Sequence, residues 1–174
     1  SLKIRTEFLG KNHSKTADSY RFLGNAHSDK GLHEKGLKYL EKALQIRQKN
    51  HNGNHDKVGE AYMDIGNFWY YHNETEKALE YYKKTKNVYA KTIGLESKVC
   101  IYLFNNFLNV YQDLYQFGEA QKALNQANKL IEQFYGKDSK QKINLLNSAG
   151  GLYLNIGDLD EALKNYSEAL TLQK

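Results

Sequence analysis

Asparagines recur at a fixed spacing along the chain, and their side chains could recognise a peptide. Asn25, Asn67 and Asn109 are 42 residues apart, and Asn105 and Asn147 form a second row with the same spacing. A side-chain amide offers a donor and an acceptor, as does a peptide backbone. If helix packing places these amides about 10 Å apart, they would meet an extended backbone about once in three residues. The alternative is that these asparagines are solvated or cap neighbouring helices; the register across copies favours the binding interpretation.

Two histidines share the same spacing but do not form a metal site. His13 and His55 are 42 residues apart, so a helix-pair spacing of roughly 10 Å or more would separate them. Zinc ligands must converge to about 2 Å from one ion. We therefore expect each histidine to cap or contact a helix end. No phosphate-binding glycine loop or nucleophile-elbow spacing occurs, so we expect no catalysis, no cofactor and no metal.

The composition excludes several classes of protein. The 174 residues have a mean hydropathy of −0.76, and no run of about 18 apolar residues predicts a membrane-spanning helix. The net charge is +5, but the 25 basic residues are scattered among 20 acidic ones, and the densest cluster is Lys83, Lys84 and Lys86. This pattern favours a solvated surface over nucleic-acid binding. The single cysteine, Cys100, is in phase with Val58, which indicates a small buried side chain and a reducing, cytoplasmic compartment.

The elements that position these side chains repeat with them. Four sets of residues recur every 42 positions without an insertion or a deletion. The sets are Gly24, Gly66, Leu108 and Gly150; Gly36, Ala78, Ala120 and Ala162; Leu40, Tyr82, Leu124 and Tyr166; and Ala43, Thr85, Ala127 and Ala169. A fixed period of this length is typical of a stacked array of one supersecondary unit.

Each copy is predicted to be two amphipathic helices. In the second copy, apolar residues follow a helical spacing, break at His72–Asn73 and resume from Ala78 to Tyr89. Gly66 stands in the middle of the first helix, where glycine costs about 1 kcal/mol relative to alanine. Repetition of that cost indicates that the second helix approaches too closely there for a side chain.

Turn residues mark the ends of the predicted helices. Gly31, Asn73 and Gly157 share a phase where a left-handed residue would end the first helix of a copy. Asn73 with Glu76, and Asp158 with Glu161, have the spacing of a capping box. A further set would close the second helices: Gly10, Gly53, Gly94 and Gly136.

These residues resemble the signature of the tetratricopeptide repeat. That signature has a small residue in the first helix, an alanine twelve residues later, a large residue four later and a second alanine three later. Here those places are held by Gly66, Ala78, Tyr82 and Thr85, and by Gly150, Ala162, Tyr166 and Ala169. The usual period is 34, and 42 is similar to the kinesin-light-chain variety, whose inter-repeat motif resembles residues 43–46 and 53–58. The proline of that motif is replaced by Ser14, Asp56, Lys98 or Lys140.

The resemblance implies an all-α fold, a right-handed α-α superhelix (a TPR solenoid) of antiparallel helix pairs. We expect residues 1–10 to be the end of a preceding repeat's second helix, followed by repeats at 11–52, 53–94, 95–136 and 137–174, the last truncated. These would form one solenoid domain from a longer protein. In the third repeat Leu108 replaces the small residue, so either the packing changes there or an apolar patch around Leu114, Tyr115 and Phe117 is exposed.

In this family the first helices of the repeats line a concave groove. The resemblance places ten residues there as peptide-binding candidates: Arg21, Asn25, Met63, Asn67, Tyr70, Tyr71, Tyr102, Asn105, Asn109 and Asn147. Met63, Tyr70, Tyr71 and Tyr102 would form an aromatic stretch, unless some of them turn into the core. Arg21 is the only cation among the groove positions, which favours an internal peptide of mixed or mildly basic character over a C-terminal carboxylate.

The predicted function is that of a non-catalytic scaffold or adaptor that binds an extended peptide or a helix of a partner protein. One alternative is a peptide-sensing array that controls an output domain outside this segment. A second is an RNA-binding helical repeat, but such codes recur at about 35 residues, and we expect neither nucleic acid nor membrane insertion. The residues do not identify the partner or the oligomeric state.

Overall fold

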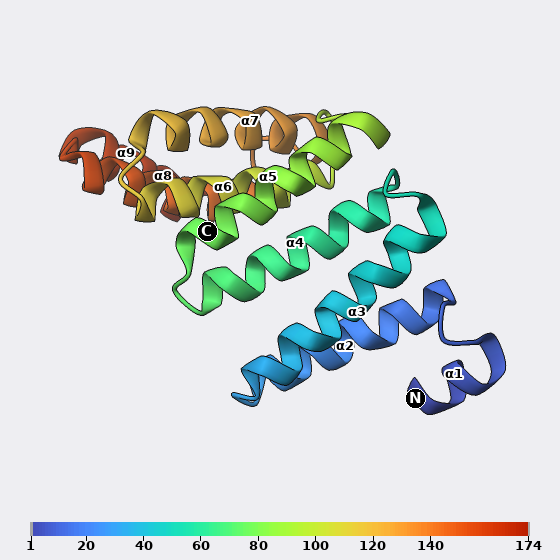
Figure 1. The fold of residues 1–174 in the computed structure, drawn as a ribbon. Helices are drawn as coiled ribbons and strands as arrows, with labels where there is room; N and C mark the ends of the chain where they lie inside the picture. Colours follow the sequence, from blue (N-terminus) through green and yellow to red (C-terminus); the bar gives the residue numbers. More distant parts are fainter. Residues whose placement is uncertain (1, 174) are drawn as a thin grey trace. The chain divides into compact units, whose positions relative to one another are not determined.

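The computed structural model describes residues 2–173, and within them all regular structure is α-helical (Figure 1). The helices are α1 (Leu2–Leu9), α2 (Ser14–Asp29), α3 (His33–His51), α4 (Asp56–Tyr71), α5 (Thr75–Thr92), α6 (Cys100–Asp113), α7 (Phe117–Tyr135), α8 (Lys140–Ile156) and α9 (Leu159–Leu172). Residue 1, the first of the predicted range 1–10, and residue 174, the last of the range 137–174, lie outside the described residues. No helix among residues 2–173 is both long and apolar enough to span a bilayer.

The helices pack as consecutive pairs. Helix α2 packs with α3, α4 with α5, α6 with α7 and α8 with α9, while α1 packs on α2. The contacts divide the chain into two compact units, Ser1–Gly94 and Leu95–Lys174, each containing two pairs. The division falls at the predicted boundary between the second and third repeats. Whether one continuous domain joins the units stays a prediction.

The mid-helix glycines lie where the paired helices approach most closely. A methyl group on Gly66 would lie 2.6 Å from Cε1 of Tyr82 in α5. Gly24 has the same relation to Leu40, at 2.7 Å from Cγ, and Gly150 to Tyr166, at 2.6 Å from Cζ. The large residue of the second helix therefore occupies the space of the missing side chain, as the spacing predicts.

Left-handed residues end the first helices, as predicted from the turn residues. Gly31, Asn73 and Gly157 have φ values of 77°, 59° and 88°, and the third copy places Tyr115 there with φ 56°. The predicted capping box at Asn73 is wrong, because Asn73 lies in the left-handed turn and α5 begins after Glu74 without a side-chain cap. The cap at Asp158 is confirmed: its Oδ1 accepts from the Glu161 amide at 3.1 Å.

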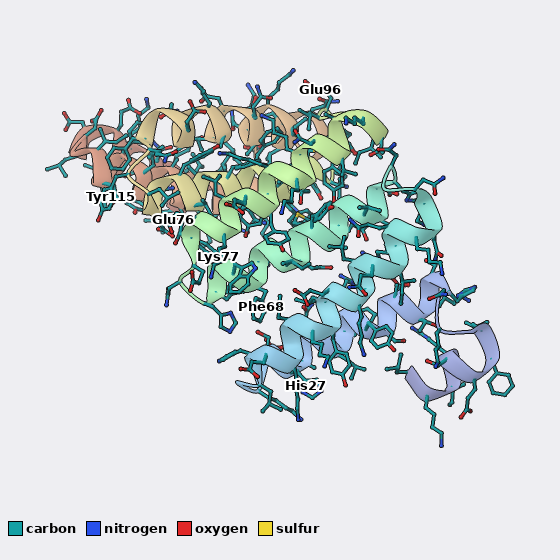
Figure 2. The ribbon with its side chains drawn as sticks, in the orientation of Figure 1. His27, Phe68, Glu76, Lys77, Glu96 and Tyr115 are labelled. Atoms are coloured by element: carbon teal, nitrogen blue, oxygen red, sulfur yellow. The ribbon has the colours of Figure 1, made fainter. Side chains whose placement is uncertain are left out.

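The third repeat packs its leucine inside. Leu108 and Leu124 are both buried, so the extra bulk of leucine in α6 accompanies a smaller partner than the tyrosines of the second and fourth repeats. Leu114 and Phe117 are half-buried. Tyr115, at the turn between α6 and α7, is 79% exposed (Figure 2). The exposed apolar surface of this turn is therefore mainly one tyrosine ring.

Candidate functional site

In the first unit, the first helices α2 and α4 contact each other and carry a chain of charged residues. Arg21 of α2 lies 3.7 Å from Asp64 of α4. Arg47 of α3 is only 2% exposed, and it lies 3.0 Å from Asp18 and 3.7 Å from Glu60. Asp18 and Glu60 are 42 residues apart, so one buried guanidinium joins equivalent acidic residues of two successive repeats.

The arginine contact is itself repeated, a feature that the sequence analysis missed. Nη1 of Arg47 donates to the backbone oxygen of Lys57 at 3.0 Å, and Nη1 of Arg5 donates to the backbone oxygen of Lys15 at 3.0 Å. Both arginines and both lysines are separated by 42 residues. The spacing of 42 residues between the two arginines was the feature of the sequence that could have indicated this contact. It also supports the prediction that α1 corresponds to the second helix of a repeat.

Asp64 is the most perturbed carboxyl group of this face. Burial raises the pKa of Asp64 to about 6, although the guanidinium of Arg21 favours its charged form. Its Oδ2 is buried without a hydrogen-bond partner among residues 2–173, as is Nε of Arg21. The charge of Arg21 is therefore directed towards Asp64, which reduces what it offers to a ligand carboxylate.

The two asparagines predicted to bind peptide in the first unit differ in their surroundings. Asn25 is exposed, whereas Asn67 is half-buried. Oδ1 of Asn67 accepts a hydrogen bond from the hydroxyl of Tyr82 at 2.9 Å. Burial raises the pKa of Tyr82, so this hydroxyl stays protonated and able to donate. Asn67 therefore positions the tyrosine that packs on Gly66, a structural role beside the predicted one.

The predicted aromatic residues of α4 lie at its C-terminal end. Tyr71 is 80% exposed, and its ring centroid lies 6.2 Å from that of Tyr70. Tyr70 and Met63 are half-buried. Tyr102, the fourth member of the predicted aromatic stretch, belongs to the second unit. A single stretch formed by all four therefore stays a prediction.

In the second unit, α6 presents a row of polar and aromatic residues, and α6 contacts α8. Tyr102, Asn105 and Asn109 are three and four residues apart and so share one face of α6. Tyr102 is 60% exposed. Oδ1 of Asn105 is buried and has no hydrogen-bond partner within the described part of the chain. Asn147 is exposed on α8, so the predicted amides of this unit come from two helices in contact.

His13 and His55 cap helices, as predicted. Nδ1 of His13 accepts from the amide of Lys15 at 3.1 Å, and Nδ1 of His55 accepts from the amide of Lys57 at 3.2 Å. Both are N-caps, of α2 and α4. Among residues 2–173, no group of three or more His, Cys, Asp or Glu side chains could hold a metal ion. Burial raises the pKa of the Cys100 thiol to about 11, which makes it a poor nucleophile.

The repeat pattern, the helix pairs and the glycine contacts agree with the comparison to known sequence families. The sequence model of the tetratricopeptide repeat matches residues 15–91 and 101–174. The chain belongs to the tetratricopeptide repeat family. This family is generally a non-catalytic scaffold fold that mediates protein interactions. No curated protein is similar enough in sequence to count as a relative.

Solved structures show the same fold. BtubC (BKLC) from P. vanneervenii has a TM-score of 0.80 at 19% identity, over 91% of this chain and 63% of that one. A kinesin light chain-like protein of Podosopora anserina with nearly identical TPR-like repeats has a TM-score of 0.80 at 17% identity, over 99% and 81%. MamA has a TM-score of 0.63 at 22% identity, over 98% and 83%. The all-α repeat fold is confirmed, and the chain spans less than two thirds of BtubC.

Proposed function

We propose that the exposed face of the first helices binds an extended peptide of a partner protein. The observation that carries this proposal is the buried Oδ1 of Asn105, which has no partner among the described residues. An unmet buried acceptor costs about 1–3 kcal/mol. Asn105 as a whole is half-buried, so a turn of its side chain towards solvent would bring this oxygen to an N–H group of a bound peptide. The exposed Tyr102 ring on the same helix face would cover the peptide.

The remaining amides define the chemistry of the peptide that fits. Asn109 comes one helical turn after Asn105, and Asn147 stands on the neighbouring α8. Each amide can donate to a backbone carbonyl and accept from a backbone amide. We infer that these amides hydrogen-bond to the main chain of the ligand rather than to one of its side chains. An extended peptide segment therefore fits this face better than the surface of a folded domain.

In the first unit, some of the predicted peptide-binding residues are already engaged in contacts within the chain. Arg21 lies against Asp64 and Asn67 accepts from Tyr82. Asn25 and Tyr71 are the predicted site residues that are exposed. With Arg21 directed to Asp64, this face lacks the cluster of cations that a C-terminal carboxylate needs. An internal peptide segment of mixed or mildly basic character therefore remains the proposed ligand.

The alternative function, a peptide-sensing array that controls an output domain, uses the same face and differs only in the consequence of binding. The buried thiol of Cys100 is consistent with the proposed cytoplasmic location. RNA binding has less support, because Lys83, Lys84 and Lys86 lie on α5, outside the first helices.

Selection from a random peptide library and subsequent NMR mapping test the proposal. A peptide selected on the purified chain should shift the backbone amide resonances of α6 around Asn105 and of α8 around Asn147. Asn147→Ala should weaken its binding about threefold to tenfold, the range for one lost hydrogen bond. Asn87→Ala, at an exposed asparagine on α5, is the matched control. Resonance shifts confined to second helices would overturn the proposal.

A further inference from the structure

The second unit contains a polar cleft that is separate from the predicted peptide-binding face. It has a volume of about 210 Å³ and is lined by residues of α7, α8 and α9. Leu145, Leu146 and Ala149 of α8 form an apolar part of its wall. None of the ten predicted groove residues lines it. The cleft is therefore a distinct feature of the fourth repeat and its junction with the third.

The equivalent place in the first unit is filled by the chain itself. There Leu40, Ile65 and Phe68 form a buried cluster, against which pack four further side chains: Leu37, Leu44, Trp69 and Tyr81. The rings of Tyr62 and Tyr81 lie 6.2 Å apart. The first unit thus closes this junction with aromatic and large aliphatic groups.

Four substitutions, each two periods of 42 residues later, remove apolar or aromatic bulk from this place in the second unit, whereas Val58 and Ala61 correspond to the larger Lys142 and Leu145. Leu37 and Leu44 correspond to Gln121 and Asn128, while Tyr62 and Tyr81 correspond to Leu146 and Asn165. All four later residues line the cleft. The cleft is therefore the same junction after two tyrosine rings and two leucines have been replaced by smaller or polar groups.

A polar group joins the lining of the cleft to the residue that corresponds to Gln48: Lys142, which lines the cleft, donates from Nζ to Oδ1 of Asn128 at 2.6 Å. In the first unit Nε2 of Gln48 donates to the hydroxyl of Tyr62 at 2.8 Å. The residue equivalent to Gln48 is Glu132. Its Oε1 accepts from Nδ2 of Asn128 at 3.2 Å and from Nζ of Lys142 at 3.4 Å. A carboxylate held in this way would accept a hydrogen bond from a phenolic hydroxyl.

The amides of the cleft can hold the main chain that carries such a ring. Nε2 of Gln121 donates to Asn125, and Nδ2 of Asn165 donates to the backbone oxygen of Glu161 at 2.7 Å. These bonds leave the amide oxygens of Gln121 and Asn165 able to accept from a peptide N–H.

The charges of the cleft are balanced. Lys142 and Lys164 are matched by Glu161 and Glu168 in its lining, and Lys164 is paired with Glu161 at 2.8 Å. Balanced charge disfavours a phosphate or another strongly charged ligand. A neutral side chain with a polar tip is the better fit.

We propose that this cleft binds a tyrosine side chain of a partner peptide. The ring would take the place that Tyr81 occupies in the first unit, where the second unit has Asn165, and would lie on Leu145, Leu146 and Ala149. Its hydroxyl would bond to the polar group made by Asn128 and Lys142, which line the cleft, and by Glu132, which Lys142 contacts. This second contact point lies outside the face proposed above, so it does not depend on that proposal.

Titration of the whole chain with N-acetyl-L-tyrosinamide, monitored by ¹H–¹⁵N NMR, tests the inference. We expect saturable shifts confined to residues 121–128, 142–153 and 161–168, with a dissociation constant of about 1 mM for a ligand of this size. N-acetyl-L-phenylalaninamide should bind about threefold to tenfold more weakly because it lacks the hydroxyl. N-acetyl-L-alaninamide should produce no saturable shifts.

Variants that refill the cleft supply the second arm. Asn165→Tyr restores the first-unit residue and should abolish binding of the tyrosine probe. Gln121→Leu with Asn128→Leu provides a second way to close the cleft if the tyrosine variant does not fold. Gln126→Tyr, at an exposed position of α7 outside the cleft, should leave binding unchanged. Equal binding of the tyrosine and alanine probes, or full binding by folded refilled variants, would overturn the inference.

Discussion

At the scale of single residues, the polar groups of the first helices divide into those already engaged and those left unmet. Asn67 accepts from Tyr82, and Arg21 lies against Asp64. Asn105 retains a buried oxygen without a partner in the described chain. The sequence predicted which asparagines hold equivalent positions in the repeats, because they follow the period of 42 residues. It did not predict these partners, because they depend on rotamers and on helix approach.

The pKa of Asp64 leads to a prediction about stability and pH. The folded pKa of about 6 lies above the usual value near 3.9, so the folded state binds this proton more tightly. The contribution of Asp64 is therefore most favourable below about pH 4 and is lost as pH rises through 6. Asp64→Asn should raise the free energy of unfolding at pH 7.5 by about 1–2 kcal/mol, less than the full shift because the attraction of Arg21 is also lost.

Urea unfolding of the Asp64→Asn variant at pH 4 and pH 7.5 measures this effect. The gain over the wild type should be small at pH 4, where the carboxyl group is neutral. Asp29→Asn, at an exposed position near the end of α2, is the control. Equal shifts for Asp64→Asn at both pH values would show that the carboxyl group is not perturbed.

Gly66→Ala tests the close approach of the helix pair. The added methyl group would lie 2.6 Å from the ring of Tyr82, and overpacking of this kind costs about 1–3 kcal/mol. The matched control is Gly118→Ala in α7, where an added methyl group meets nothing within 4 Å. That change should stabilise by up to about 1 kcal/mol through helix propensity. Thermal unfolding of both variants should move in opposite directions; a stabilised Gly66→Ala would contradict the packing described here.

At the scale of elements, the 42-residue period predicted the helix pairs and most of their turns. Gly31, Asn73 and Gly157 were found from their phase, but Tyr115 was not, because tyrosine is not a usual left-handed residue. The arginine contacts were not predicted, because arginine stands at this position of the repeat only at Arg5 and Arg47. The next copy has Tyr89 at this position, and its ring packs against Gly59.

The turn between α6 and α7 should gain stability from a glycine. Tyr115 has φ 56° and is 79% exposed, so its left-handed conformation costs about 1–2 kcal/mol with little burial in return. Tyr115→Gly should raise the free energy of unfolding by about 1 kcal/mol, after the greater chain entropy of glycine is allowed for. Denaturant unfolding measures the change.

Tyr115→Ala separates conformation from ring contacts. Alanine keeps the cost of the left-handed turn and loses the contact with Phe117, whose ring centroid lies 6.0 Å from that of Tyr115. It should be no more stable than the wild type. If alanine stabilised as much as glycine, the tyrosine ring rather than the backbone would be the source of strain.

At the scale of the whole molecule, the copies of the repeat share one backbone framework but differ in the side chains at their helix junctions. The first unit joins its repeats through the buried Arg47 and closes its helix junction with Tyr62 and Tyr81. In the second unit, Oδ1 of Asn105 is buried without a hydrogen-bond partner among residues 2–173, and a cleft lies beside Asn165. The period predicts the shared framework, whereas these differences arise at positions where the copies diverge.

The most direct test of peptide recognition is the affinity and stability of Asn105→Ala. A peptide selected on the wild type should bind this variant about tenfold more weakly by calorimetry. The free energy of unfolding should be unchanged or higher by about 1 kcal/mol, because a buried acceptor without a partner has been removed. Together these results would show that Asn105 is held for a ligand rather than for the fold. Unchanged affinity, with Asn87→Ala behaving identically, would contradict the proposed site.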